Sequence, residues 1–333
     1  MLPLSIHSRR TDVGQPRAFM QTHQPVMLQA CLDGLALRVG DIAIDATFGR
    51  GGHSAALLNA VGEQGFVHAL DQDPEACGAA WKRFGARNNF RIHASNFSEL
   101  QRIADEQGLS GRVNGLLLDL GVSSPQLDDA ARGFSFSHDG PLDMRMNPSA
   151  GESAAQWLAR AAEKEIADVL FAYGDERASR RIAKRIVESR AQSPLTRTAQ
   201  LAALIASAVP GPRRKIHPAT RSFQAIRIHI NGEMDALQAA LDASVAVLAP
   251  GGRLAVISFH SLEDRCVKRF MRDAGPPVNV PSAELAMMQP PRPQRWFKRA
   301  GRFFPGDAET ASNPRARSAV LRVAERSDVE AGS

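Results

Sequence analysis

Short apolar runs alternate with helical patterns along the first part of the chain, and each run ends in a polar or glycine-rich segment. The fourth run is apolar throughout, as expected of a strand that is buried on both faces of a parallel sheet. The predicted strands cover Ile42 to Ala46, Phe66 to Leu70, Phe90 to His93 and Val113 to Leu118. This alternation predicts an α/β fold with a doubly wound parallel sheet.

The alternation stops after the fourth strand. Residues Gly133 to Ser149 are rich in Gly, Pro, Asp and Ser and predict a long loop, which at this length is usually functional. Four helical patterns follow, over Ser153 to Ala162, Glu163 to Ala172, Glu176 to Arg190 and Thr198 to Val209. Pro210-Gly211-Pro212 ends the last of them. The sequence therefore predicts a small helical domain inserted into the α/β fold.

The α/β pattern then returns. It predicts a helix from Glu233 to Leu248, a strand from Leu254 to Phe259 and a helix from Leu262 to Asp273. A last strand is expected from Ala319 to Ala324. The stretch from Ala274 to Ala311, with its prolines and basic residues, predicts a long irregular segment.

A glycine-rich segment, Asp45 to Ser54, lies between the first strand and the next helix. Glycines at 49, 51 and 52 allow a tight turn and close approach to a ligand, so valine at Gly51 or Gly52 is expected to block the ligand and spare the fold. The spacing differs from the dinucleotide pattern Gly-x-Gly-x-x-Gly, and an acid, Asp45, opens the loop. An acid repels a pyrophosphate but attracts an ammonium group. The loop therefore favours S-adenosylmethionine (SAM) over NAD, with an ordinary strand-to-helix turn as the alternative.

Further polar or aromatic residues follow the next three strands. Asp71 ends the second strand, about 20 residues past the glycines, where an acid accepts hydrogen bonds from ribose hydroxyls. Phe97 follows the third strand and is placed to lie against an adenine ring, and Asp119 ends the fourth. Because ligands of such sheets bind at the carboxyl ends of the strands, these residues predict one site. Asp73, before Pro74, is interpreted as a helix cap.

The length of 333 residues suits a large α/β domain with an insertion. No apolar run reaches the roughly 18 residues that a membrane span needs, and the first twenty residues have no apolar core of signal-peptide length. Cys31, Cys77 and Cys266 are widely spaced, which supports neither a disulfide framework nor a zinc site. We therefore expect a cytoplasmic protein with no metal and no membrane partner.

The net charge of +6 conceals a strong segregation of charge. Between Arg177 and Arg227 twelve Lys or Arg stand against one acid, Glu188, and between Arg292 and Arg326 nine stand against three. A solvated helix face usually carries both positive and negative side chains. A block with almost only positive side chains therefore predicts a surface that binds phosphates. The single Tyr makes stacking on aromatic platforms a weak expectation.

Seven blocks of sequence together resemble one known family. They are Asp45–Ser54, Asp119–Asp128, Arg132–Phe136, Gly140–Met146, His217–Arg221 with Phe223–Arg227, Ser258–Arg265 and Asn313–Arg317. In this order they resemble the bacterial 16S ribosomal RNA N4-cytosine methyltransferases, also called MraW or RsmH. The resemblance covers about Thr22 to Arg326 and says nothing of the preceding residues.

The resemblance implies a class I SAM-dependent methyltransferase fold with an inserted helical substrate domain. The substrate would be a decoding-centre (P-site) cytosine of 16S rRNA, within the small ribosomal subunit. Cofactor contacts are implied for Gly51, Gly52, His53, Asp71, Phe97, Asp119 and Gln126. The residues by themselves would suggest a helix cap for His53 and a loop polar group for Gln126. RNA contacts are predicted at Arg213, Arg214 and Lys215 from their charge, and at His217 and Arg221 from their block.

The predicted organisation has five segments. A flexible tail covers 1–21, the methyltransferase domain covers 22–125 and 227–325, a mainly helical substrate domain is inserted over 126–226, and a second tail covers 326–333.

The exocyclic amine of cytosine is a poor nucleophile, so catalysis needs alignment with the methyl donor and an acceptor for the amine hydrogen. Asp119 and Ser123 are the candidate catalytic residues, with the backbone near Ser124 and Pro125 as alternatives. Other amino-methyltransferases carry two prolines and an aromatic residue here, and this chain does not, so the acceptor is left open. Asp119 could instead hold only the cofactor. Methylation at carbon 5 would need a cysteine at a strand end, and none is there.

Several alternatives remain open from the sequence. The protein could methylate another RNA or DNA, or it could be a catalytically silent SAM-binding ribosome assembly factor. The substrate could be free RNA or an assembled subunit. The protein could be a monomer or a homodimer.

Overall fold

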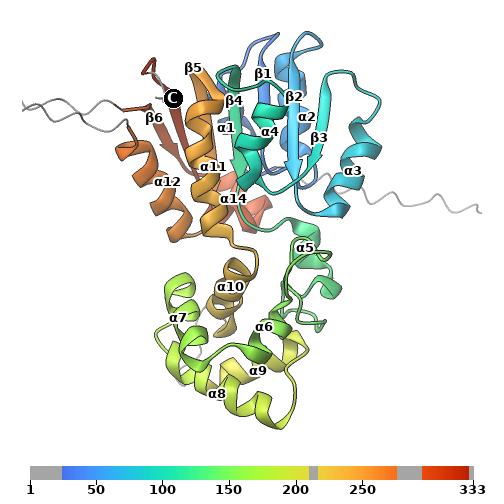
Figure 1. Ribbon diagram of the computed structural model, residues 1–333, viewed down its shortest axis with the longest axis vertical. Coiled ribbons are helices and arrows are strands. Elements are labelled where there is room, and N and C mark those ends of the chain that lie inside the picture. Colours follow the sequence, from blue (N-terminus) through green and yellow to red (C-terminus); the bar gives the residue numbers. More distant parts are fainter. Residues whose placement is uncertain (1–24, 210–216, 276–294, 330–333) are drawn as a thin grey trace, which may run out of the picture.

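A computed structural model describes residues 25–209, 217–275 and 295–329. Within them a seven-stranded sheet has the order β3-β2-β1-β4-β5-β7-β6 (Figure 1). Its strands are β1 (Ile42–Asp45), β2 (Phe66–Asp71), β3 (Phe90–Ala94), β4 (Val113–Asp119), β5 (Leu248–Ser258), β6 (Phe297–Phe303) and β7 (Val320–Arg326). The strands from β3 to β5 are parallel, and β7 runs antiparallel to both β5 and β6. The predicted doubly wound α/β fold is confirmed.

Helices cover both faces of the sheet because side chains alternate along each strand. Leu116 and Leu118 of β4 face one core and Leu117 faces the other. The first core is completed by α4 (Leu100–Glu106), α11 (Glu233–Val247) and α12 (Ser261–Asp273). The second is completed by α1 (Leu28–Leu35), α2 (Gly52–Val61) and α3 (Pro74–Phe84).

A third hydrophobic core lies in the part of the chain between β4 and β5. Figure 1 shows this helical part beyond the edge at which β1, β2 and β4 end. Trp157, Leu142 and Met144 are almost completely buried in it. Its helices are α5 (Ser124–Asp128), α6 (Ala154–Arg160), α7 (Glu163–Gly174), α8 (Ser179–Gln192), α9 (Thr198–Ala208) and α10 (Ala219–Ile230).

Two elements differ from the sequence-based expectation. Helix α10 was not predicted, and the boundary expected at 226 falls inside it. Since Ile230 still packs against the helical core, we propose that the inserted part ends there. The segment predicted as irregular up to Ala311 contains β6 and α14 (Asp307–Ser312), so that prediction is wrong for these residues. The tail predicted over 1–21 lies outside the described residues.

Short 3-10 turns complete the fold. They are η1 (Phe97–Glu99), η2 (Ala130–Arg132) and η3 (Pro314–Ser318).

Candidate active site

The glycine loop joins β1 to α2 and is held by two acids, the buried Asp45 and the half-buried Asp71. Asp45, which is fully buried, accepts hydrogen bonds from the Thr47 amide (3.2 Å) and the Ser54 hydroxyl (2.6 Å). Burial raises the pKa of Asp45, and His53, Ser54 and Thr47 act against this rise. Both oxygens of Asp45 thus bond within the protein. Asp45 shapes the loop, and the expectation that it attracts an ammonium group stays a prediction.

The glycines of the loop serve the packing of the protein itself. Gly51 has a φ of +69°, and a Cβ there would lie 2.5 Å from the Phe48 ring. A Cβ on Gly52 would lie 2.3 Å from Pro25. Because these contacts are with buried or half-buried protein atoms, the expectation that valine at either position spares the fold is wrong. Gly51 and Gly52 remain predicted cofactor contacts, and the Gly51 amide already donates to the Phe48 carbonyl at 2.7 Å.

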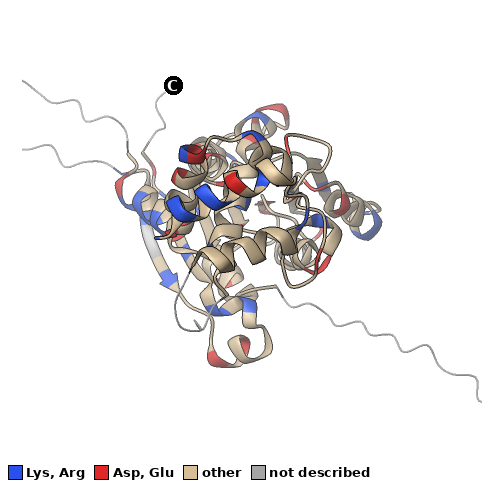
Figure 2. Cartoon of the chain, turned by 90° about the horizontal axis from the view of Figure 1, so that it is seen from below, with Lys and Arg blue, Asp and Glu red and all other residues tan. Residues whose placement is uncertain are grey.

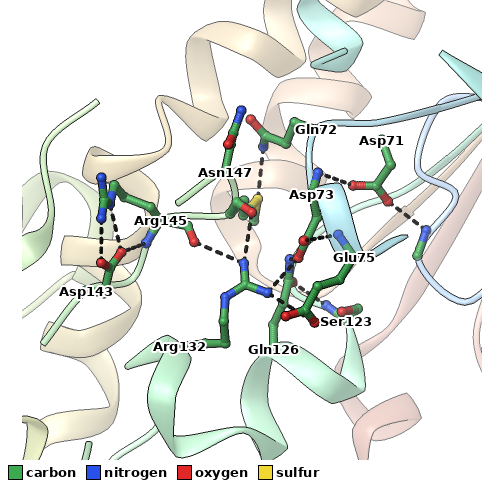
Figure 3. A network of polar contacts seen from close by, with 12 residues as sticks. Asp71, Gln72, Asp73, Glu75, Ser123, Gln126, Arg132, Asp143, Arg145 and Asn147 are labelled. Carbon is green, nitrogen blue, oxygen red and sulfur yellow. Dashed lines mark hydrogen bonds and ion pairs between the residues drawn. The ribbon is translucent and has the colours of Figure 1, made fainter. Parts of the chain in front are cut away.

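Asp71, at the end of β2, faces the same loop (Figure 3). One carboxylate oxygen accepts a hydrogen bond from the Gly49 amide at 2.8 Å, and the other accepts one from the Asp73 amide at 2.9 Å. Burial raises the pKa of Asp71 to about 6, although both amides act against the rise. A carboxylate oxygen has more than one acceptor position, so each can still accept a ribose hydroxyl.

The buried His53 and the half-buried Asp119 form a pair between α2 and the end of β4. The distance from His53 Nε2 to Asp119 Oδ2 is 3.4 Å, longer than an aligned hydrogen bond. Burial lowers the pKa of His53, but Asp119 and Asp45 more than reverse this, and the net shift is upward. Within the described residues, neither His53 Nε2 nor Asp119 Oδ1 has a hydrogen-bond partner although both are buried. Buried polar atoms of this kind fit a site in which a bound ligand supplies the partner.

Gln126 begins a network that joins the sheet edge to the helical part (Figure 3). Its side-chain nitrogen donates to Asp73 at 2.8 Å, and its oxygen accepts from the Ser123 amide at 2.9 Å. Arg132 donates to the same Asp73 oxygen at 2.8 Å and to the Met146 carbonyl at 2.8 Å. Asp73 also caps α3 as predicted, since it accepts from the Glu75 amide.

The sequence did not indicate the pairing of Asp73 with Arg132. The only signal was that Arg132 opens one of the seven blocks.

The other predicted residues divide between two regions. Phe97 begins η1 after β3 and packs, half-buried, against the core of the sheet. Ser123 precedes α5 and lies beside the glycine loop, since a Cβ on Gly49 would be 4.0 Å from the Ser123 Cβ. His217 and Arg221 lie on the helical part: the His217 ring contacts Phe136, and Arg221 donates to the Asp175 carbonyl.

Arg213, Arg214 and Lys215 lie outside the described residues, so their predicted RNA contacts are not placed here.

Cysteine, metal and membrane chemistry can be assessed for the described residues only. Cys77 lies next to the end of β2, but its thiol donates to the Asp71 carbonyl and burial raises its pKa to about 11. Such a thiol is protonated and a poor nucleophile. Over residues 25–209, 217–275 and 295–329, no group of three or more His, Cys, Asp or Glu could hold a metal ion. In the same ranges every helix is too short or too polar to span a bilayer.

The sheet order, the glycine turn after β1 and the acids after β2 and β4 are those of an α/β methyltransferase. The model of the MraW methylase family matches residues 20–327, and the chain belongs to this family. It is therefore a methyltransferase with SAM as its cofactor. The resemblance based on the seven blocks is confirmed.

Two curated relatives are similar over almost their whole length. "Ribosomal RNA small subunit methyltransferase H" of Thioalkalivibrio sulfidiphilus is 56% identical over 91% of this chain and 97% of its own. The protein of the same name from Nitrosococcus oceani is 52% identical over 92% of this chain and 98% of its own.

Solved structures are more distant. An rRNA methylase from Streptococcus thermophilus has a TM-score of 0.37 and 14% identity, over 89% of this chain and 93% of its own. Fibrillarin from Aeropyrum pernix, solved with S-adenosyl-L-methionine, has a TM-score of 0.39 and 10% identity, over 89% of this chain and 73% of its own.

Proposed function

We propose that this protein methylates the exocyclic N4 amine of a decoding-centre (P-site) cytosine of 16S rRNA, in the cytoplasm. Two relatives named ribosomal RNA small subunit methyltransferase H, which match at 52–56% identity, support the substrate class. The observation that carries the proposal is the buried Asp119 oxygen without a hydrogen-bond partner among the described residues, at the carboxyl end of β4. It is an acceptor suited to the hydrogen of an amine.

The residues of the site have separable roles in this reaction. SAM supplies an electrophilic methyl group on a sulfonium. Asp71 orients the cofactor by accepting hydrogen bonds from its ribose. Asp119 accepts a hydrogen bond from the target amine, whose hydrogens become more acidic as the nitrogen becomes tetrahedral. His53, whose pKa is raised mainly by Asp119, lies 3.4 Å from that carboxylate.

Alignment supplies much of the remaining rate enhancement. Holding the amine, the methyl carbon and the sulfur in line contributes up to about 7–11 kcal/mol in well-oriented reactions. In this proposal the cofactor is positioned by Gly51, Gly52, Phe97 and Gln126. Ser123 lies near the target cytosine. The geometry of the thiols supports attack by the amine over attack at carbon 5, because Cys77 is protonated and already bonded.

Of the proposed RNA-binding residues, His217 and Arg221 are described and lie on the helical part. Arg213, Arg214 and Lys215 supply positive charge, and His217 and Arg221 are exposed on or beside α10. Phosphate contacts of this kind position a nucleic acid without selecting its bases.

The decisive experiment is nucleoside mass spectrometry of 16S rRNA. The wild-type protein is incubated with labelled SAM and, in parallel, with small ribosomal subunits or with free 16S rRNA. RNA from a strain that lacks the gene serves as the unmethylated reference. We expect N4-methylcytidine from the subunits, at one decoding-centre position. Methyl at carbon 5, or no methylated cytosine in either substrate, would overturn the proposal.

Assembly state is read separately. Light scattering during size-exclusion chromatography distinguishes a monomer from a homodimer.

A further inference from the structure

A second concave site lies on the helical part, away from the cofactor edge. It is a cavity of about 720 Å³ formed by residues of α7, α8, the end of α9 and α10. None of its lining residues belongs to the glycine loop or to the ends of β1, β2 and β4. The site described above therefore does not account for it.

One wall of the cavity is an exposed aromatic ring. The Phe171 residue is 60% exposed, although Ile166 and Leu170 of the same helix are completely buried. A single exposed apolar residue needs no special explanation. This ring, however, borders a cavity that four arginines also line.

These arginines are largely uncommitted. Arg177, Arg180 and Arg181 are exposed and have no ion pair or side-chain hydrogen bond with any described residue. Among the described residues, Arg221 donates only to the Asp175 carbonyl, at 3.1 Å. Figure 2, which views the molecule from the side of the helical part, shows Lys and Arg gathered along α8.

Two acids also line the cavity, and both already have partners. Asp168 pairs with Lys164 at 2.6 Å, and Glu176 is 3% exposed and accepts from the Ala178 amide at 2.8 Å. Four guanidinium groups thus face two engaged carboxylates.

We propose that this cavity binds a nucleotide of the substrate RNA other than the target cytosine. The base stacks on Phe171, and Arg177, Arg180 and Arg181 bind the neighbouring phosphates. Stacking on an aromatic face is tolerant of sequence, and guanidinium groups match phosphate oxygens bidentately. The cavity is then a second anchor, which fixes the RNA on the helical part while the target base enters the sheet edge. This inference rests on the proposed function.

The test compares variants in equilibrium binding of 16S rRNA and in methylation of small subunits, at several salt concentrations. Arg180→Gln combined with Arg181→Gln should raise the Kd for RNA and reduce the salt slope by about 0.7–0.9 per lost phosphate contact. Phe171→Leu should weaken RNA binding about 5- to 150-fold, the range of a lost base stack, while Phe171→Tyr retains it. The KM for subunits should rise, with kcat and SAM affinity unchanged.

Matched controls lie on the same helix. Lys184 and Arg185 are exposed and pair with Glu188 at 3.9 and 3.5 Å, and neither lines the cavity. Lys184→Gln combined with Arg185→Gln removes the same charge and should change RNA binding less than the Arg180, Arg181 pair. Thermal unfolding verifies that every variant is folded. We expect folded variants because the substituted side chains are exposed.

Three outcomes decide the inference. If the wild type methylates the subunits and the cavity variants match it in RNA affinity and salt slope, the inference is overturned and the proposed function stands. If the variants impair methylation of subunits but bind and methylate free rRNA normally, the cavity contacts a protein, and the RNA assignment is overturned. If the wild type methylates no rRNA, the proposed function itself has failed.

Discussion

Asp71 has a carboxyl group whose ionisation falls near neutral pH, because burial raises its pKa to about 6. A raised pKa means that the folded protein without ligand favours the protonated acid. The contribution of Asp71 to stability is therefore greatest below about pH 4 and is lost as the pH rises through 6. A ribose hydroxyl donates to the ionised form, so SAM binding should show the opposite dependence.

We expect the Kd for SAM to rise as the pH falls below about 6, by up to about tenfold per pH unit, and to level off above pH 7. Asp71→Asn should abolish this dependence, and Asp71→Ala should weaken binding at pH 7.5 by about 1.5–3 kcal/mol. Calorimetric titration between pH 5 and 8 measures both effects. His53 also has a raised pKa in this site. If Asp71→Asn keeps the full pH dependence, that dependence belongs to His53.

Gly51 should matter to folding before it matters to the cofactor. Replacement by valine forces a β-branched residue to a φ of +69° and drives it into the Phe48 ring. The backbone strain costs about 1–2 kcal/mol and the overpacking about 1–3 more. Chemical unfolding in the absence of SAM should show this loss. Gly111→Val is the matched control, since Gly111 has a φ of +70° and nothing within 4 Å of an added Cβ. Equal losses at the two positions would refute the role of the Phe48 contact.

At the scale of elements, Arg132 of η2 links the start of α3 to the loop that contains Met146, and Gln126 of α5 bonds to the same Asp73 oxygen. Its ion pair with Asp73 is buried, with side chains 8% and 5% exposed. Arg132→Met should cost about 3–5 kcal/mol of unfolding free energy, because it leaves an unpaired buried carboxylate. Lys164→Met, which breaks the exposed pair with Asp168, should cost about 1 kcal/mol or less. Comparable losses measured in urea would show that the Arg132 network is not a structural link.

The elements that the sequence predicted are those with strong local signals. The four strands from β1 to β4 are short apolar runs bounded by turns, and the acids at their ends fall at one edge because the strands are parallel. Helix α10 escaped prediction because Ile226, Ile228 and Ile230 alternate as in a strand, and only tertiary packing makes them helical. Strand β6 lies at the edge of the sheet and pairs with β7 across a register shift, so it has no regular apolar alternation.

The site was predictable to the same extent. Asp71 and Asp119 follow directly from strand ends, whereas Arg132 meets Asp73 across a separation of 59 residues, which no local pattern encodes. The unpartnered atoms of His53 and Asp119 are properties of three-dimensional geometry alone.

At the scale of the whole molecule, the segregation of charge predicts a salt dependence that differs between the two ligands. The basic block should make RNA binding fall steeply with salt, while SAM binding, at a buried edge, should change little. Substitution of Arg213, Arg214 and Lys215 together by alanine should reduce the salt slope of RNA binding by about 0.7–0.9 per lost contact and leave the Kd for SAM unchanged. Filter binding at salt concentrations between roughly 50 and 300 mM measures the RNA affinity and hence its salt slope. A triple variant with wild-type slope and methylation would show that these residues do not bind phosphates.

The insertion of the helical part between β4 and β5 also has a consequence for the order of folding. These strands are neighbours, with Asp119 opposite Ile257, so their pairing must close a loop of more than a hundred residues. The helical part has its own core, and its early collapse would bring the two ends of that loop together before the sheet is complete. Trp157 lies in the helical core, and Trp296 packs against the sheet core beside β6. In stopped-flow refolding of single-tryptophan variants, the Trp157 signal should therefore precede that of Trp296, and simultaneous signals would indicate that the two parts fold as one unit.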